Sequence, residues 1–582
     1  MAKSYAVLFG GEAGYGVMSA GSILAKAAVR SGYWSIVVNE YPSLIKGGLN
    51  NCLVQVAEQT IGACEETADV LGALSQPAFE YNAARVKPGG IIFYDAAAVK
   101  PDAAKAGEGV ILVPLSLVPK GTGDTAKVMA STALAGAFCA LTGFPAAAVK
   151  VVITDTFSSA EVCEKNLVIF DAAYREATAA GLPASYSLNR PAEASRNLLV
   201  NGNEAISIGA IKAGCKFAAG YPMTPGSSVL TYLADHGPAY GLVFKQAEDE
   251  IAAMNMLIGA GFAGVRAMGS TSGGGFALMT EALGFAGQAE IPVVMVEAQR
   301  GGPSTGLPTR TAQADLNFAV YASQGEFPRF VVAPGDVEEC FYETHRLFNL
   351  VEQYQVPGIV LTDKYLADTS FTVTPFVMDG LGIDRGKLAN EAALAEVQPY
   401  LRYRQTEDGI SLRAVPGQAG GRHIATSYTH GEDGFYSSGN HEYAGQEPEV
   451  TAAGLDKWYR KVPHMEQAVP GIKQYGPDTA DLTLIVWGST KGAALEAAKQ
   501  AAAEGLSVNV LQILYVCPFP AAVLTEALKK VRRSLLIEGN KTAQLALMLR
   551  GYTGFAPDQY YLKYDSRPFT PSGILAKIRE VL

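Results

Sequence analysis

Residues able to bind an anion or to move a proton gather in one stretch of the sequence, between positions 220 and 310. The stretch begins with the loop Tyr221-Pro222-Met223-Thr224-Pro225. Its two prolines fix the backbone on both sides of Thr224, so the hydroxyl can donate to an anionic acceptor without first being ordered. A rigid turn with a capping threonine would have the same sequence, so this loop alone does not decide between ligand binding and structure.

Glu250 is the second candidate, because it stands at the head of an apolar segment. Residues Ile251 to Gly261 have the length and all-round apolarity of a buried helix. A carboxylate beside such a helix is costly unless it has a partner or a chemical role. The acid could instead stabilise the helix N-terminus through the macrodipole. Glu248 is the alternative candidate for the same chemical role.

Two further loops follow apolar segments that read as strands. Ser270 to Gly275 is a Ser-Thr-Ser-Gly-Gly-Gly loop that includes Ser272, and Arg300 comes soon after Pro292 to Val296. That segment and Val243 to Lys245 read as short buried strands. If the strands are parallel, these loops meet at the carboxyl edge of one sheet, which is where α/β proteins bind ligands.

The arginines of the stretch are candidates for holding a carboxylate. The guanidinium of Arg300 or of Arg310 can bind a carboxylate through two parallel hydrogen bonds. Each arginine could equally belong to a structural ion pair, so both interpretations stay open.

The N-terminal segment carries two glycine-containing loops. Gly10 to Gly16 lies between a predicted strand and a predicted helix, where glycines let a backbone approach a phosphate. A dinucleotide site would also need an acid after the second strand, and Glu40 fits only approximately; a tight turn explains the loop equally well. In the next loop, Lys46 stands beside Gly47 and Gly48, where its ammonium group can either reach an anion or be solvated.

Composition excludes several classes of protein. The 582 residues carry a net charge of -10, which argues against a nucleic-acid partner. No apolar run approaches the roughly 20 residues that span a bilayer, and the N-terminus lacks a signal-peptide core, so we expect a cytoplasmic protein without membrane spans. The seven cysteines are scattered and have no metal-site or cluster spacing.

Taken together, these motifs resemble the 2-oxoacid:ferredoxin oxidoreductases. The Tyr-Pro-x-Thr-Pro loop at 221–225 resembles that of their alpha subunits, and the loops at 10–16 and 46–48 resemble their gamma module, although the first departs from the commoner Gly-Gly-Gln-Gly form. Near the C-terminus, Glu538-Gly539-Asn540 and Gln544-Leu545 resemble the Glu-x-Asn and Gln-Leu signature of their transketolase C-terminal-like domain, with Ala543 in place of a usual glycine. The resemblance covers nearly the whole chain as a gamma–alpha fusion.

The resemblance implies an α/β fold with three α/β domains. We expect a gamma-type domain at 1–185, a linker at 186–196, a thiamine diphosphate pyrimidine-binding domain at 197–375, an irregular connection at 376–475 and a transketolase C-terminal-like domain at 476–582. The irregular part contains His423, His430 and His441. Their spacing matches no standard metal site, and we interpret the region as a surface insertion.

The resemblance also implies roles for the candidate residues. Glu250 would act on the aminopyrimidine of thiamine diphosphate, favouring the imino tautomer that takes the proton from the thiazolium ring. Tyr221, Pro222 and Ser272 would contact that cofactor. Thr224, Arg300 and Arg310 would hold the substrate carboxylate, and Lys46 would select 2-oxoglutarate.

Other components would have to come from a partner, since the chain lacks a Gly-Asp-Gly site for Mg²⁺ and the cysteines for an iron–sulfur cluster. The resemblance implies a beta subunit that supplies Mg²⁺ and a [4Fe-4S] cluster, an (αβ)₂ assembly, ferredoxin as electron carrier and coenzyme A as co-substrate. The alternatives are a pyruvate or branched-chain 2-oxoacid enzyme, a non-oxidative thiamine decarboxylase component, and a dinucleotide-binding flavoprotein subunit.

Overall fold

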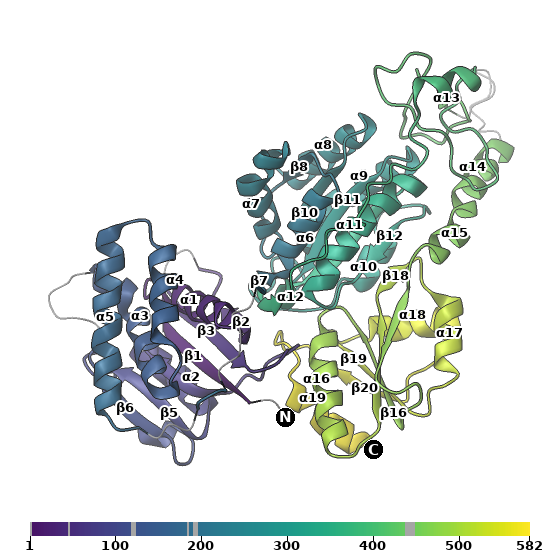
Figure 1. Cartoon of the computed structure of the whole chain (residues 1–582). Coiled ribbons are helices and arrows are strands. Elements are labelled where there is room, and N and C mark those ends of the chain that lie inside the picture. Colours follow the sequence, from purple (N-terminus) through teal and green to yellow (C-terminus); the bar gives the residue numbers. More distant parts are fainter. Residues whose placement is uncertain (1–2, 45–46, 118–123, 183–185, 190–195, 437–447) are drawn as a thin grey trace. The chain divides into compact units, whose positions relative to one another are not determined.

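The computed structural model describes residues 3–44, 47–117, 124–182, 186–189, 196–436 and 448–582. The chain forms two compact units, each described here by itself (Figure 1). The first contains Met1–Asn201, Asp368–Pro375 and Thr570–Ser572, and the second contains Gly202–Ala367, Phe376–Phe569 and Gly573–Leu582. The predicted division into domains at 185, 196, 375 and 475 stays a prediction.

The first unit is built on an eight-stranded sheet in the order β6-β5-β4-β1-β3-β2-β14-β7. β14 lies more than 300 positions after β2 in the sequence, yet it pairs antiparallel with both β2 and β7. The strands are β1 (Ser4–Glu12), β2 (Trp34–Glu40), β3 (Leu49–Ala57), β4 (Ala68–Ala73), β5 (Val86–Asp95), β6 (Ile111–Leu115), β7 (Leu198–Asn201) and β14 (Ser370–Val373).

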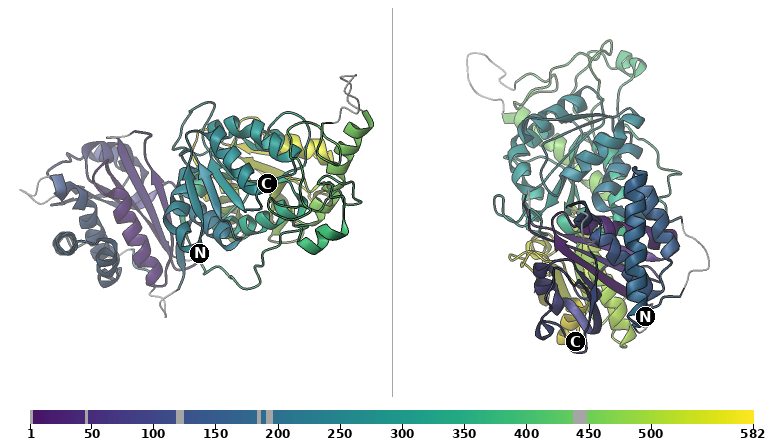
Figure 2. Two further views of the ribbon diagram at one scale, coloured as in Figure 1. Left: turned by 90° about the horizontal axis from the view of Figure 1, so that it is seen from above. Right: turned by 90° about the vertical axis from the view of Figure 1, so that its left-hand side faces the viewer.

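Helices cover both faces of this sheet, because apolar side chains of β1 alternate between the faces. Val7 and Phe9 join one core and Ala6 and Leu8 join the other. Four helices pack on the first face (Figures 1 and 2), and the short α2 packs on the second. The helices are α1 (Val17–Arg30), α2 (Gln76–Asn82), α3 (Asp124–Thr142), α4 (Ala146–Thr156) and α5 (Ala160–Ala179).

The second unit contains a seven-stranded sheet in the order β18-β12-β13-β11-β10-β8-β9. All neighbouring strands in it are parallel except β18, which pairs antiparallel with β12. The strands are β8 (Phe217–Gly220), β9 (Val243–Gln246), β10 (Ala267–Thr271), β11 (Val293–Gln299), β12 (Phe330–Val332), β13 (Pro357–Asp363) and β18 (Tyr515–Cys517). The helices are α6 (Gly202–Lys212), α7 (Ser227–His236), α8 (Glu250–Phe262), α9 (Gly273–Gln288), α10 (Leu316–Tyr321), α11 (Val337–Tyr354) and α12 (Lys364–Asp368).

A second, five-stranded sheet in the order β15-β17-β16-β19-β20 belongs to the same unit. One continuous core joins the two sheets, so β18 and the side chains around it bind the C-terminal part to the seven-stranded sheet. The strands are β15 (Ile472–Tyr475), β16 (Leu482–Trp487), β17 (Val508–Ile513), β19 (Ser534–Glu538) and β20 (Gln559–Leu562), and the helices are α16 (Thr490–Ala503), α17 (Ala521–Leu528), α18 (Gln544–Thr553) and α19 (Pro571–Val581). The connection between the sheets contains α13 (Glu391–Glu396), α14 (Pro448–Arg460) and α15 (Val462–Gln467).

These sheets confirm the predicted α/β class, and two local predictions need correction. β9 forms where a strand was expected, but it is an edge strand and Val243 is 62% exposed instead of buried. The helix predicted from Ile251 is α8, but the apolar side chains on one of its faces are exposed: Ile251 is 49% and Met256 is 37% exposed. Apolarity on all sides does not distinguish a helix buried within its own chain from one with an uncovered apolar face. Among the described residues no helix is both long and apolar enough to cross a membrane.

A buried charge cluster fixes α14 and α15 to the end of α9. The Glu290 carboxylate forms one ion pair with Lys457 Nζ and another with Lys461 Nζ, each at 2.6 Å. All three side chains are almost fully buried. Burial by itself would raise the pKa of Glu290, but Lys457, Lys461 and Arg402 outweigh it and hold this pKa well below its usual range. The carboxylate is therefore the counter-ion of both buried lysines, which would repel each other without it.

We predict that Glu290→Gln strongly destabilises the second unit, because it leaves two buried lysines without their counter-ion. Breaking a buried pair of this kind costs about 3–5 kcal/mol. The matched control is Lys529→Met, which breaks an exposed pair with Glu526 and should cost at most about 1 kcal/mol. Thermal unfolding measures both; equal shifts in Tm for the two variants would contradict the structural role of the cluster.

Candidate functional site

The candidate residues lie at the carboxyl ends of four parallel strands of the seven-stranded sheet. The loop 221–225 follows β8, Glu250 follows β9, Ser272 follows β10 and Arg300 follows β11. Because β9, β8, β10 and β11 are neighbours in that order, their carboxyl ends share one edge of the sheet. The topology thus brings together residues that are up to 80 positions apart.

Direct contacts connect these loops. The backbone N–H of Gly275 donates to the Met223 thioether at 3.2 Å, and Ser270 Oγ donates to the Gly226 carbonyl at 2.8 Å. A Cβ atom on Gly226 would lie 2.4 Å from the Thr271 carbonyl oxygen, so only glycine allows this approach. Tyr221 and Pro222, at the start of the same loop, are exposed.

Glu250 occupies the first position of α8 and is 4% exposed. It does not cap the helix, because Asp249 Oδ1 accepts the N–H of Ala252 at 2.7 Å. Glu248, the alternative candidate, is exposed to solvent. Within the described chain no hydrogen bond or ion pair joins the Glu250 carboxylate to another residue, so its oxygens are available to a ligand.

The surroundings of Glu250 fit the aminopyrimidine of thiamine diphosphate. A Cβ atom on Gly275 would lie 2.2 Å from Thr271 Oγ1 and 2.7 Å from Glu250 Oε1, so only glycine allows these side chains to approach α9 so closely. Ser272 Oγ, on the adjacent loop, is buried and has no hydrogen-bond partner among the described residues. A carboxylate and a hydroxyl without partners are groups that a polar heterocycle can satisfy.

The two arginines differ in their surroundings. Arg300 is 8% exposed, and its Nη1 donates to the Thr224 carbonyl at 2.7 Å, so it is bound directly to the threonine loop. Arg310 is half-buried in the irregular segment after β11, where its carbonyl accepts the N–H of Gly301 at 3.2 Å. The structure therefore places Arg300 within the cluster, and for Arg310 it shows a backbone role in closing the loop.

The remaining candidates, which are Lys46, the loop at 10–16 and Glu40, belong to the first unit. Lys46 lies outside the described residues. In the loop 10–16, a Cβ on Gly10 would lie 2.8 Å from Asn82 Nδ2, so close packing explains that glycine. Glu40 forms an ion pair with Arg85 at 3.1 Å, and β3 lies between β1 and β2. A dinucleotide fingerprint needs those two strands as neighbours and a free acid, so the geometry does not fit one.

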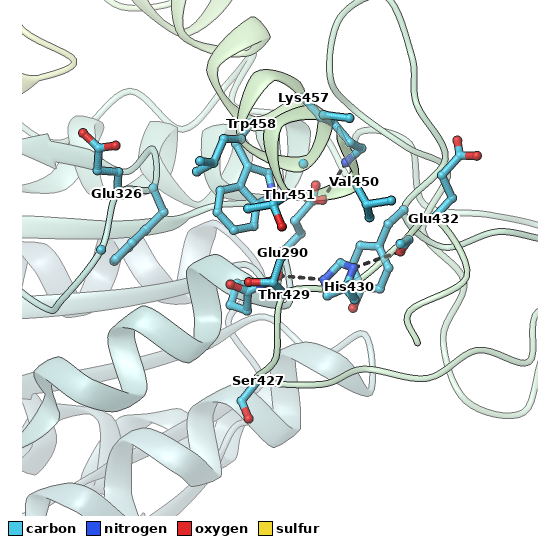
Figure 3. A pocket seen from close by; sticks show the side chains of 18 of the residues that line it. Glu290, Glu326, Ser427, Thr429, His430, Glu432, Val450, Thr451, Lys457 and Trp458 are labelled. Atoms are coloured by element: carbon cyan, nitrogen blue, oxygen red, sulfur yellow. Dashed lines mark hydrogen bonds and ion pairs between the residues drawn. The ribbon is translucent and has the colours of Figure 1, made fainter. Parts of the chain in front are cut away.

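A separate cavity of about 930 Å³ lies at the C-terminal end of α9 (Figure 3). The lining includes Trp458, Thr429, His430, Glu290 and Lys457, and it includes none of the candidate site residues. His430 stacks on Tyr403 and contacts two carbonyl oxygens, and His423 packs against Phe262; His441 lies outside the described residues. In the parts of the chain that are described, no group of three His, Cys, Asp or Glu residues could hold a metal ion.

Two acids near the loops that carry Thr224, Ser272 and Arg300 were not identified from the sequence. Glu297 lies on β11 and is fully buried, and Asp315 precedes α10. Asp315 Oδ2 is 2.7 Å from the position that a Cβ on Gly273 would occupy, at the start of α9. The available signal was Glu297, an acid three positions before Arg300 in a strand whose first four residues are all apolar.

Comparison with protein families assigns each part of the chain. Residues 6–176 match the family described as pyruvate ferredoxin/flavodoxin oxidoreductase, and residues 208–443 match its thiamine diphosphate-binding domain. Residues 474–544 match the transketolase C-terminal domain. These matches confirm the three predicted kinds of domain.

Two similar proteins match over nearly the whole chain, and a third matches about two thirds of it. The chain is 30% identical to the alpha subunit of 2-oxoacid:ferredoxin oxidoreductase 2 of Aeropyrum pernix, over 99% of this chain and 97% of that one. It is 34% identical to the 2-oxoglutarate synthase subunit KorA of Methanothermobacter marburgensis, over 65% of this chain and 97% of the relative. A solved chain of the 2-oxoglutarate:ferredoxin oxidoreductase of Magnetococcus marinus, with 2-oxoglutarate, coenzyme A and succinyl-CoA bound, superimposes with a TM-score of 0.91 at 32% identity over 99% of both chains. On these matches, the chain belongs to the alpha subunits of the thiamine diphosphate-dependent 2-oxoacid:ferredoxin oxidoreductases.

Proposed function

We propose that this alpha subunit serves an enzyme that interconverts 2-oxoglutarate plus coenzyme A and succinyl-CoA plus CO₂, with ferredoxin as the electron carrier. The observation that carries the proposal is the full-length similarity to the chain of Magnetococcus marinus that was solved with these substrates. The similarity to the KorA subunit supports it. Relatives named only as 2-oxoacid enzymes keep pyruvate or a branched-chain 2-oxoacid as the alternative substrate.

In this proposal some of the candidate site residues bind the cofactor and others bind the substrate. Thiamine diphosphate, when bound, supplies the carbon nucleophile and the electron sink for decarboxylation of a 2-oxoacid. The carboxylate of Glu250 would accept a hydrogen bond from the protonated ring nitrogen of the aminopyrimidine, and Tyr221, Pro222 and Ser272 would contact the ring. Arg300 and Thr224 bind the substrate carboxylate, with Arg310 beside them.

Assembly with a beta subunit completes the site in this proposal. The partner would supply Mg²⁺, the diphosphate contacts and a [4Fe-4S] cluster, in an (αβ)₂ complex. The uncovered apolar face of α8 and α9, which includes Ile251, Met256 and Leu278, supports a partner here because an exposed apolar patch beside a candidate site is typical of an interface.

We predict that the isolated chain is colourless, binds thiamine diphosphate poorly and has no oxidoreductase activity. Brown colour and turnover should appear only when the beta subunit is present. In the complex, Met256→Lys combined with Leu278→Lys should weaken co-purification of the two subunits at least about 10-fold, since each lysine places a charge in an apolar interface.

The control for this experiment is Val523→Lys, an equally exposed apolar position on α17, which should leave assembly unchanged. Full activity of the isolated chain would contradict the proposal. Normal assembly of the double variant would remove the α8–α9 face from the interface.

We predict that Glu250→Gln slows hydrogen–deuterium exchange at C2 of the bound cofactor by about 10²–10⁴, because the amide keeps the shape of the side chain but removes its basicity. Nuclear magnetic resonance of quenched complex measures this rate. Glu248→Gln is the matched control and should exchange normally, because Glu248 is exposed. A loss confined to the Glu248 variant would transfer the role to that residue.

We predict that Lys46→Met lowers kcat/KM for 2-oxoglutarate by roughly 30-fold or more, while pyruvate and 2-oxoisovalerate are nearly unaffected. The distal carboxylate of 2-oxoglutarate needs a cation, and truncating one partner of a buried charge pair has an effect of this size. Lys26→Met, at an exposed position of α1, is the control. A wild-type preference for pyruvate or 2-oxoisovalerate would contradict the substrate assignment, and an equal loss on all three substrates would remove Lys46 from specificity.

A further inference from the structure

Glu297 is a buried carboxyl group for which the proposed reaction has no use. It lies on β11 between Thr271 of β10 and Leu361 of β13, in the middle of the sheet, and its exposure is 0%. No N–H or hydroxyl donor among the described residues reaches either of its oxygens. An ionised carboxylate cannot be accommodated at such a position without a counter-ion or a donor.

The one polar group that does meet it is another carboxyl group. The Asp315 side chain is hydrogen-bonded to Glu297, and the Asp315 backbone N–H donates to Gln299 Oε1 at 3.0 Å, which fixes the residue in place. Two carboxyl groups can form a hydrogen bond only if one of them carries a proton. Burial raises the pKa of Glu297 well above its ordinary value, and the charges of Asp315 and Asp363 raise it further.

Asp315 faces the candidate substrate site on its other side. Its charge acts on the Arg300 guanidinium, whose Nη1 holds the Thr224 carbonyl at 2.7 Å and whose Nε has no partner. Asp315, Asp363 and Arg300 are the charged groups that act on this pair. The Glu297–Asp315 pair thus acts on Arg300 through charge, and Arg300 in turn holds the threonine loop through the Thr224 carbonyl.

We propose that Glu297 and Asp315 share one proton, and that this pair positions Arg300 to receive the carboxylate of a 2-oxoacid. The proton allows Asp315 to remain ionised beside Arg300 although a second carboxyl group adjoins it. Glu297 is thus a positioning residue, which acts through Asp315 and Arg300 without touching the substrate. The proposal rests on the substrate role proposed above for Arg300.

Two variants of Glu297, tested in the complete complex, distinguish the effect of its hydrogen bond to Asp315 from the effect of its packing. Glu297→Gln keeps a neutral donor toward Asp315, so kcat/KM near neutral pH should stay within about 3-fold of wild type. Glu297→Val removes the donor, and KM for 2-oxoglutarate should rise about 10-fold or more, as for loss of one hydrogen bond to a charged group. kcat should change less, because Arg300 acts in substrate binding.

The pH dependence of KM is the second measurement. In the wild-type complex KM should rise at alkaline pH, when Glu297 loses its proton and the two carboxylates repel each other. In Glu297→Gln that rise should be absent, since an amide cannot lose this proton. Glu343→Gln is the matched control: Glu343 is another buried acid of raised pKa, bound to the Tyr515 hydroxyl at 2.8 Å, and this variant should keep the wild-type profile.

Infrared spectroscopy tests the proton without turnover. The wild-type complex at neutral pH should show a protonated-carboxyl C=O band that is missing in Glu297→Gln and disappears from wild type as the pH is raised. An unchanged band, or an unchanged alkaline rise of KM, in Glu297→Gln would overturn the shared proton. If the band behaves as expected but Arg300→Lys leaves KM for every 2-oxoacid unchanged, the positioning role fails together with the proposed role of Arg300, while the pair itself stands.

Discussion

A carboxylate that leaves water must acquire a cation, a set of hydrogen-bond donors or a proton, because its lost hydration is otherwise not replaced. The second unit meets this constraint differently at each acid. Glu290 is bound by two lysines, and Glu352 is bound by Arg266 and Arg413 at 2.8 Å each, with Arg385 beside it. Glu538 accepts hydrogen bonds from Asn540 and from backbone N–H groups. Glu250 and Glu297 have no such partner among the described residues; Glu250 lies at the edge where the loops converge, and Glu297 lies within the sheet.

The exceptions differ in a way that separates chemistry from support. Glu250 stands at the start of a helix, and no other described residue binds its carboxylate, so its partner can come from outside the chain. Glu297 lies inside the sheet, where only the neighbouring acid reaches it. Ligand binding at Glu250 and a bound proton at Glu297 would each compensate for the hydration that a carboxylate loses on burial.

Much of this arrangement can be predicted from the sequence where local signals decide it. The strands Leu482–Trp487 and Ser534–Glu538, for example, each end directly before a glycine, which is a signal that the local sequence contains. The convergence of Thr224, Glu250, Ser272 and Arg300 follows from the rule for parallel strands. The pairing of β18 with β12, about 180 positions apart, has no local signal. The burial of Glu297 likewise depends on β13, which enters the sheet 60 positions later, and the bare face of α8 cannot be distinguished from a buried one by composition.

The position of β14 has a consequence for how such a chain can be divided. β7 joins the first sheet only through β14, and β14 comes from a segment far downstream, so the first unit is not a continuous piece of polypeptide. A fragment ending at Asn201 would expose the hydrogen-bonding edge of β2 and leave β7 without any strand to pair with. A chimaera that takes the first unit from a relative would therefore also have to include the segment of that relative that corresponds to Asp368–Pro375. A cut at the linker alone would separate strands that belong to one sheet, which makes the fusion hard to reverse once it has formed.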